Sequence, residues 1–389
     1  MNIFTHFKKL QYLRFCFAFI LFNCIILKGE SQNNTPDAFY KFDEIYNKKL
    51  DSIYNDYNFW NGCWSVAWKS WKEKDEYVIN GTPSEHRVFS ALDGKAMIEL
   101  AYNDSIIQGS KTAGFSIRYF DSGLNKWVML QSWPGKNAPN ISSLQGTYHH
   151  GRIQLYRNGK TSTKNKYTPI GTPYVNRYTF SDTKKESFRW DQSYSKDSMR
   201  TWFTSTIAEF TRKTDFHSLK EKKSNYWFTY GDGYNCDDSI LEDLKPFLGQ
   251  WQGKTTYFDG AQQKTSNSIR VLMPFLSNCG ALGYQIDEFE NGEINKEIMF
   301  ATYLPKSSEW VFYTLNNIKG ESHTLYISNS LVNPEIKFSK RDLFDVPSSN
   351  PIESFNWNMK NEDKQEIIGY SKEGKIVYKK TLKKIDIQN

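Results

Sequence analysis

The sequence predicts an all-β protein made of two copies of one folding unit joined head to tail. Twelve Trp, 24 Tyr and 27 Phe residues make the chain rich in aromatic side chains, which favour half-buried strands over helices. Short segments recur in the same order in both halves, and three of the five pairs are 183 residues apart: Gly62 and Gly249, Arg87 and Arg270, Trp127 and Trp310, Ile153 and Ile336, Glu186 and Glu353. The repeat divides the chain into two units of roughly 150 residues, each large enough to bury its own core.

Residues 1–31 have the pattern of a secretory signal peptide. Basic residues precede an apolar run from Phe15 to Leu27, and the small residues Gly29 and Ser31 follow it. The run is too short to span a bilayer comfortably, so no integral membrane segment is expected after cleavage. We therefore expect a protein that is exported to the periplasm or the cell exterior, or associated with the cell surface.

Each unit is expected to begin with a helix. Apolar residues in 32–58 recur at alternating intervals of three and four, which predicts an amphipathic N-terminal helix. A shorter segment, Ser239 to Phe247, repeats the pattern before the second unit. The polar segment 215–238 is expected to be the linker between the units.

After each helix the pattern changes to short runs of period two, separated by turn signals about ten residues apart. Asp121-Ser122-Gly123 and Asn158-Gly159 are two of these turn signals. The runs predict two antiparallel meanders, in residues 59–214 and 239–386, each rolled into a closed barrel.

These features together resemble the lipocalin or calycin superfamily, and especially its little-characterised bacterial members. The segment from Phe247 to Gly253 matches the Leu-Gly-x-Trp opening of that group, and Trp60 to Trp64 is a more distant match. The repeated Glu-Ser-Phe-x-Trp segments match a later strand of the same group. The resemblance implies two calycin-like barrels and carries no enzymatic activity with it.

The resemblance also implies structural roles at the closed end of each barrel. Trp64 and Trp251, which follow Gly62 and Gly249, are expected to pack there under a basic residue of the last strand. That residue is expected to be Arg212 in the first unit. In the second unit the candidates are Lys380 and Lys383.

Aromatic and basic residues that point into the barrels are the candidate ligand-binding residues. Side chains alternate along a strand, so Trp190 and Trp357 share a face with Phe188 and Phe355. An eight-stranded barrel is just wide enough for its own side chains or for one small ligand, so the aromatic residues either fill the core or contact a ligand. A guanidinium would hold an anionic head group. The candidates are Arg87, Trp127, Trp190, Arg270, Trp310 and Trp357.

The sequence predicts no cofactor or metal. His149 and His150 are adjacent on an expected strand, so they would point to opposite faces and not chelate one ion.

The mature chain keeps Cys63, Cys236 and Cys279, which allow at most one internal disulfide. The segment from Ser195 to Trp202 resembles an Asp-box hairpin with Met199 at the glycine position, and we expect a β-hairpin there.

Charge excludes one class of partner. Removal of residues 1–31 lowers the formal charge from +7 to +4, because four basic residues and one acid are lost. Basic and acidic residues are interleaved along the remaining chain, without the one-sided stripe that phosphate binding needs. Nucleic acid is therefore not an expected partner.

Three functional hypotheses follow. The leading one is a non-catalytic carrier or sensor of a small apolar or amphipathic molecule held in a barrel, with Arg87 or Arg270 as its polar anchor. The second is a cell-surface hydrolase of glycans or lipids with paired carboxylates at a barrel mouth. The third is an interaction module with filled barrels. The sequence contains no Gly-x-Ser-x-Gly elbow and no other recognisable catalytic motif.

Overall fold

The structure of the protein is a computed structural model. It describes residues 52–72, 76–79, 83–107, 110–134, 139–161, 169–213, 242–275, 280–304, 307–316, 322–328, 335–341 and 351–385. The expected signal peptide, most of the expected helix at 32–58 and almost all of the expected linker lie outside these ranges.

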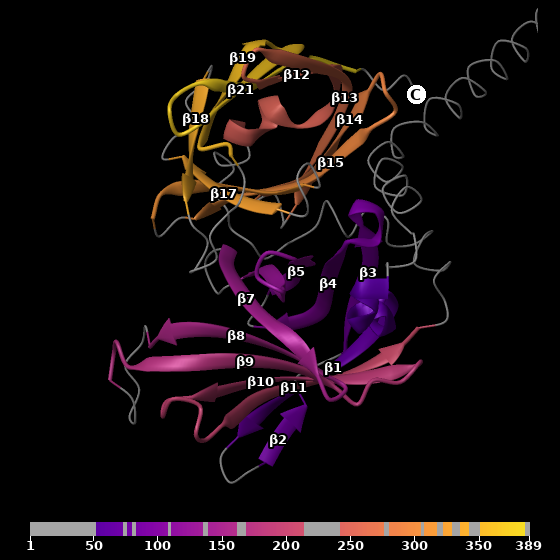
Figure 1. The fold of residues 1–389 in the computed structure, drawn as a ribbon. Coiled ribbons are helices and arrows are strands. Elements are labelled where there is room, and N and C mark those ends of the chain that lie inside the picture. Colours follow the sequence, from indigo (N-terminus) through magenta and orange to yellow (C-terminus); the bar gives the residue numbers. More distant parts are fainter. Residues whose placement is uncertain are drawn as a thin grey trace, which may run out of the picture.

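Within these ranges the chain forms two antiparallel meanders that each close on themselves, which confirms the predicted all-β fold with two tandem barrels (Figure 1). The first barrel closes because β1 pairs with both β3 and β11. A further strand, β2 (Glu76–Ile79), pairs with β1 outside the ring. The ring strands are β1 (Gly62–Lys72), β3 (Ser84–Ala91), β4 (Ala96–Ile107), β5 (Ser110–Asp121), β6 (Lys126–Pro134), β7 (Pro139–His149), β8 (Arg152–Lys160), β9 (Pro173–Ser181), β10 (Ser187–Ser195) and β11 (Phe203–Arg212).

The second barrel closes through the pairing of its first and last strands, β12 and β21. Its strands are β12 (Gly249–Asp259), β13 (Gln262–Phe275), β14 (Gly280–Phe289), β15 (Ile294–Leu304), β16 (Glu309–Asn316), β17 (Ser322–Ser328), β18 (Glu335–Arg341), β19 (Ser354–Asn361), β20 (Lys364–Tyr370) and β21 (Ile376–Lys384). In this article the two rings are called barrel 1 and barrel 2.

A short helical segment precedes each barrel. Residues 52–60 form the 3-10 helix η1 (Ser52–Trp60), and residues 242–244 form a helical turn that continues into η3 (Lys245–Phe247). The first-strand Trp of each barrel donates its indole N–H to a carbonyl of this segment: Trp64 to Trp60 O at 2.6 Å, and Trp251 to Phe247 O at 3.2 Å. Figure 1 shows the second segment lying across the opening of barrel 2.

Each barrel has ten strands, whereas the sequence-based expectation about interior space assumed eight. Barrel diameter grows with strand number, so a ten-stranded ring encloses more room than the width at which side chains alone fill the interior.

The expected turn at Asn158-Gly159 is wrong, because both residues lie inside β8. Gly159 pairs with Tyr174 on β9, and a Cβ at Gly159 would lie 2.5 Å from the Tyr174 ring. The glycine therefore allows a tyrosine of the neighbouring strand to pack over the backbone.

The strand register corrects the alignment of the two copies. Trp64 faces His86, and Trp251 faces Arg270, so His86 and Arg270 correspond at a spacing of 184 residues rather than 183. A shift of one residue exchanges the two faces of a strand. Arg270 thus points into barrel 2, whereas Arg87, opposite Cys63, lies on the outer face of barrel 1.

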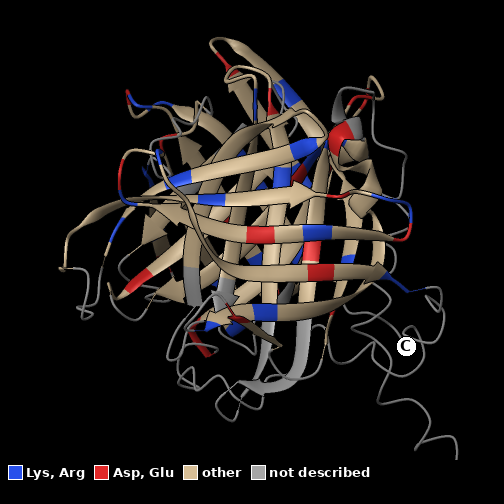
Figure 2. Ribbon diagram, turned by 90° about the horizontal axis from the view of Figure 1, so that it is seen from below, with Lys and Arg blue, Asp and Glu red and all other residues tan. Residues whose placement is uncertain are grey.

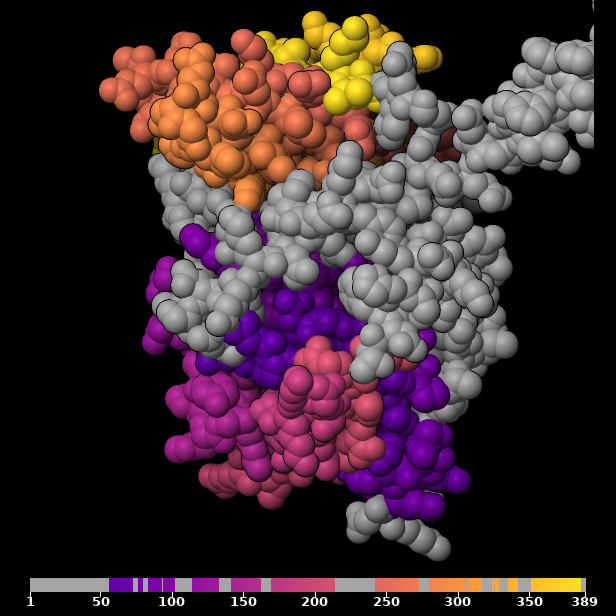
Figure 3. Space-filling model, turned by 90° about the vertical axis from the view of Figure 1, so that its right-hand side faces the viewer, coloured from indigo at the N-terminus to yellow at the C-terminus, as the bar shows by residue number. Residues whose placement is uncertain are grey.

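The outer faces of the two barrels pack against each other. Strands β4–β6 and β14–β16 contribute most of one cluster of buried apolar side chains, which we call the shared wall. At this wall Phe115 stacks on Phe300, with ring centroids 4.9 Å apart and planes 19° from parallel. Figures 1 and 3 show barrel 2 seated on barrel 1 along this side.

Charged residues of both signs are interspersed over the strands, as Figure 2 shows. None of the helices within the described ranges has the length and apolar character needed to cross a bilayer.

Candidate functional site

The interior of barrel 2 divides into an apolar end and a polar end. The apolar end lies next to η3 and contains Trp251, Phe312, Phe355 and Trp357. Farther along the same strands, inward positions carry polar and charged side chains. These residues, which we call the polar chamber, are Arg270, Gln285, Asp287, Glu297, Thr314, Gln365 and Lys380.

Arg270 lies where the two ends meet. It is 3% exposed, and its guanidinium carbon lies 4.4 Å from the ring centroid of Trp357. Its Nη2 donates to Met299 Sδ at 3.2 Å, while Nε and Nη1 have no hydrogen-bond partner among the described residues. Burial lowers the pKa of Arg270, and the charge of Glu297 acts against that shift. Since the guanidinium starts from a pKa far above neutrality, it remains a cation with two open donors.

Other open polar groups surround this guanidinium. Gln285, whose Oε1 has no partner in the described part of the chain, pairs directly with Arg270 across two strands. Thr314, also with an open hydroxyl, pairs with Met299. Gln365 accepts the Trp357 indole N–H and leaves its own Nε2 open. Buried polar groups are normally hydrogen-bonded, so these open atoms are the ones in the described part of barrel 2 that could still accept a polar partner.

The carboxylates of the polar chamber already have partners. Asp287 accepts hydrogen bonds from Tyr257 at 2.6 Å, from Gln285 at 2.9 Å and from Thr255 at 3.2 Å. Glu297 pairs with Lys380 at 3.4 Å. Burial, followed by the neighbouring Asp287, raises the pKa of Tyr257, so its hydroxyl stays a neutral donor. Arg270 thus has charge and donors available for an anion.

Barrel 1 places its interior arginine differently. Arg118, on β5, lies with its guanidinium carbon 3.4 Å from the ring centroid of Trp60, and it pairs with Glu99 at 3.2 Å. Burial alone would raise the pKa of Glu99, but Arg118, His86 and Ser116 outweigh that effect and lower it to about 2. The cation of barrel 1 therefore pairs directly with a carboxylate, whereas Glu297 and Asp287 act on Arg270 without a direct ion pair among the described residues. Like Arg270, Arg118 has no hydrogen-bond partner at Nε and Nη1 within the described ranges.

The closed end of barrel 1 contains the residues that the resemblance implied. Arg212 lies 4.2 Å from the Trp64 ring and donates to the carbonyls of Phe59, Asn61 and Lys185. A Cβ at Gly62, where φ is +126°, would lie 2.4 Å from this guanidinium.

In barrel 2 the basic residue over Trp251 is Lys384, whose Nζ lies 5.6 Å from the Trp251 ring centroid. The expected residues, Lys380 and Lys383, do not take this position. Gly249 also has positive φ, at +113°. Lys384 pairs with Trp251 in the strand register, whereas Lys380 lies farther along β21 beside Glu297. The sequence could not distinguish these lysines, because their position depends on the register of β21 against β12.

The four remaining tryptophan candidates lie at different depths. Trp127 is buried and donates its indole N–H to Asp56 at 3.0 Å. Trp310 is also buried, and its ring centroid lies 5.5 Å from that of Tyr303. Trp190 is half-buried and contacts Tyr178 and Trp68. Trp357 alone of the four contacts an interior arginine with open donors, within the part of the chain that the structure describes.

Arg87 is placed away from both interiors. Its guanidinium carbon lies 6.0 Å from the ring of Phe89, a residue of the shared wall. In barrel 1 the inward position that corresponds to Arg270 is therefore His86, the residue before Arg87.

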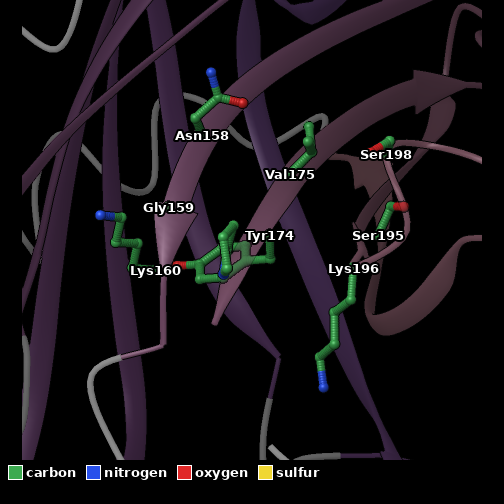
Figure 4. Close-up of a pocket in the computed structure, with 9 residues that line it drawn as sticks. Asn158, Gly159, Lys160, Tyr174, Val175, Ser195, Lys196 and Ser198 are labelled. Atoms are coloured by element: carbon green, nitrogen blue, oxygen red, sulfur yellow. The ribbon is translucent and has the colours of Figure 1, made fainter. Parts of the chain in front are cut away.

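A surface pocket of about 380 Å³ lies at the ends of β8 and β9 and beside the hairpin after β10 (Figure 4). Its walls include Lys160, Tyr174 and Lys196, and Figure 4 shows both lysine side chains directed away from Tyr174. The pocket is open to solvent and contains no buried charged group among its lining residues.

Beside it, the expected hairpin forms around Asp197. Ser195 and Thr201 both donate to this carboxylate, at 2.7 and 2.6 Å. Met199 occupies the expected glycine position and has φ of +69°, a conformation that disfavours side chains.

No group of three or more metal-binding side chains occurs in the described ranges. His150 lies in the turn after β7 with positive φ, and its ring centroid is 6.5 Å from that of His149.

Burial raises the pKa of the Cys63 thiol to about 12. Cys236 and Cys279 lie outside the described residues.

Sequence reasoning missed Glu99, Arg118 and Gln285. One signal was present: Met97-Ile98-Glu99-Leu100 and Phe115-Ser116-Ile117-Arg118 each carry one charge inside a strongly apolar run. A charge in such a run is rarely buried without a partner, so the two runs suggest a pair. Their spacing along the chain does not reveal that the two strands are neighbours in register.

Comparisons with known proteins add little to this geometry. No family model matches the sequence, and no curated protein matches it. Among solved structures, the chain is similar to a protein of unknown function from the DUF3598 family of Nostoc punctiforme, with 8% identity and a TM-score of 0.21 over 86% of this chain and 100% of that one. It is also similar to a mutant porin of Rhodopseudomonas blastica, with 7% identity and a TM-score of 0.17 over 83% of this chain and 97% of that one. Scores this low support no argument about fold or function.

Proposed function

We propose that the protein is an exported binding protein that holds a small amphipathic anion inside barrel 2. The observation that carries the proposal is the buried guanidinium of Arg270, with two open N–H donors above the Trp357 ring. The anionic group would accept from Arg270 and Gln365, while the apolar part would contact the aromatic residues of the closed end.

Two further features support a bound molecule. Ten strands give a wider interior than the eight-stranded barrel in which side chains alone fill the space. The sequence resemblance to calycins, whose first-strand Gly-x-Trp is matched by Gly249 and Trp251, points to a fold used for carrying small ligands. Export follows from the signal-peptide pattern of residues 1–31.

Binding of 1-anilinonaphthalene-8-sulfonate, a small amphipathic anion that fluoresces in apolar surroundings, tests the site. We expect Arg270→Met to weaken binding at least tenfold, because a charged hydrogen bond contributes about 1.5–3 kcal/mol. Circular dichroism checks that the variant is folded, because the carboxylates of Glu297 and Asp287 act on the Arg270 charge and lose that interaction in the variant.

The control is Lys264→Met, which removes an exposed cation that pairs with Glu293 on the surface of the same barrel. It should leave the affinity unchanged. Equal binding by the wild type and Arg270→Met would contradict the proposal, as would a wild type that binds no probe and carries no molecule detectable by native mass spectrometry after purification from its own host.

A further inference from the structure

Barrel 1 contains a buried chain of three side chains that goes beyond the binding function of barrel 2. Ser84 Oγ lies 3.0 Å from His86 Nε2, and His86 Nδ1 lies 2.7 Å from Glu99 Oε1. All three residues are at most 3% exposed. Ser84 and His86 point to the same side because they are two residues apart on β3, and Glu99 comes from the neighbouring strand β4.

The surrounding groups fix the direction of each hydrogen bond. Glu99 also accepts from Ser116 at 2.6 Å and from Arg118 at 3.2 Å, and these donors keep it ionised. An ionised Glu99 can only accept a hydrogen bond, so His86 donates its Nδ1–H to Glu99 and the Nε2 lone pair faces Ser84. The indole N–H of Trp68 donates to Ser84 Oγ at 2.7 Å, which leaves the Ser84 proton directed toward His86. This is the relation of nucleophile, base and orienting carboxylate found in serine-dependent acyl transfer.

Barrel 2 shows that the fold does not need this chain. By strand register, the positions of Ser84, His86 and Glu99 correspond to Ser268, Arg270 and Gly283. Barrel 2 has the serine but neither the base nor the carboxylate at the corresponding positions. It nevertheless closes as a ring of ten strands, as barrel 1 does. The base and the carboxylate therefore belong to barrel 1 specifically and are not a requirement of the ring.

We propose that Ser84, His86 and Glu99 form a nucleophilic site that cleaves small carboxylic esters with an apolar acyl group. Ser84 accepts a hydrogen bond from Trp68, whose half-buried indole meets the half-buried indole of Trp190 edge to face at 5.6 Å. These indoles supply the apolar surface that such an acyl group would contact.

The reaction balances with water as the second substrate. Ser84 Oγ adds to the ester carbonyl to give a tetrahedral oxyanion and passes its proton to His86 Nε2. The carbon–oxygen bond of the ester breaks, and the leaving alkoxide takes the proton from His86. Water then adds to the acyl-Ser84 ester, His86 accepts its proton, and that proton returns to Ser84 as the carboxylic acid departs.

The experiment uses the purified exported protein and diisopropyl fluorophosphate, a small reagent that phosphorylates activated serines. Intact mass and peptide mapping should show one adduct, on Ser84, together with hydrolysis of p-nitrophenyl butyrate. Ser84→Ala should abolish both. His86→Gln should slow adduct formation at least 100-fold, in line with the loss of a general base.

The matched control is Ser268→Ala, which removes the corresponding serine of barrel 2 and should change neither rate. Circular dichroism checks that each variant is folded. A wild type with no Ser84 adduct overturns the proposal whether or not the variants fold. Adduct formation that persists in Ser84→Ala, or that proceeds at the wild-type rate in folded His86→Gln, overturns it as well. None of these outcomes bears on the anion site at Arg270, which is tested by a different probe.

Discussion

Glu99 shows how a single buried carboxylate makes stability depend on pH. Burial raises its pKa, but Arg118 and the other donors outweigh burial, so the pKa falls from the ordinary 4.5 to about 2. A carboxylate whose pKa is lower in the folded state stabilises that state above its unfolded pKa, and the contribution disappears as the pH falls toward the folded pKa.

We therefore expect the free energy of unfolding of the wild type to fall between about pH 4.5 and pH 2. Glu99→Gln should lose this part of the slope, and at neutral pH it should be destabilised by about 3 kcal/mol because Arg118 is left buried without a counter-ion. Urea titrations followed by Trp fluorescence measure both effects. Glu209→Gln, which removes an exposed carboxylate of the same barrel, should keep the wild-type slope. An identical slope in Glu99→Gln would contradict the assigned role.

Met199 is strained by its place in the hairpin at Asp197. Its φ of +69° costs a residue with a side chain about 1–2 kcal/mol, and its side chain is 54% exposed, so little packing offsets the cost. Met199→Gly should raise the free energy of unfolding by about 1 kcal/mol, measured by urea titration. Met199→Ala keeps the strained backbone and should give no gain. A destabilised glycine variant would refute this explanation.

At the scale of elements, the last strand of each barrel holds the helical segment in place with unequal strength. Arg212 stacks on Trp64 and donates to three carbonyls, whereas Lys384 lies over Trp251 at the longer distance of 5.6 Å. Arg212→Ala should lower the free energy of unfolding by about 2 kcal/mol, and Lys384→Ala by less than 1 kcal/mol. Chemical unfolding of both variants compares the two ends directly. Equal losses would show that the three carbonyl contacts do not stabilise barrel 1.

Strands were predictable from the sequence because period-two alternation is a local property of the chain. Phe203 to Arg212 and Trp310 to Leu315, for example, carry this pattern and form β11 and β16. Two tandem barrels followed from the repeat, and the Trp64 and Arg212 contact followed from the resemblance. The number of strands per barrel did not follow, because a turn signal can also lie inside a strand, as Asn158-Gly159 does in β8, so counting turn signals does not count strands.

The site was less predictable because it depends on register. Arg87 and Arg270 look equivalent when the copies are aligned by sequence, yet the pairing of Trp64 with His86 and of Trp251 with Arg270 places Arg87 on the other face. In the same way, the approach of Ser84, His86 and Glu99 requires β3 and β4 to pair in one register out of several. Local patterns do not specify that register, since it is set by the packing of both barrels.

At the scale of the whole molecule, the shared wall should couple the unfolding of the barrels. Phe300 is fully buried and stacks on Phe115, so Phe300→Asp would place a charge between two apolar faces. We expect one calorimetric transition in the wild type and two in this variant, as the barrels separate. Ile269→Asp, at an exposed position on the outer face of barrel 2, should keep one transition. Two transitions in the wild type would mean that the wall does not couple the barrels.

The two faces that meet at this wall come from corresponding strands, β4–β6 of one copy and β14–β16 of the other. Each copy therefore covers the apolar outer strands of the other. Either barrel alone would expose these apolar strands and would need a second molecule to cover them, so its folded population would depend on concentration. Fusion of two such copies makes the association intramolecular, which frees each interior to diverge while the contact between them is kept.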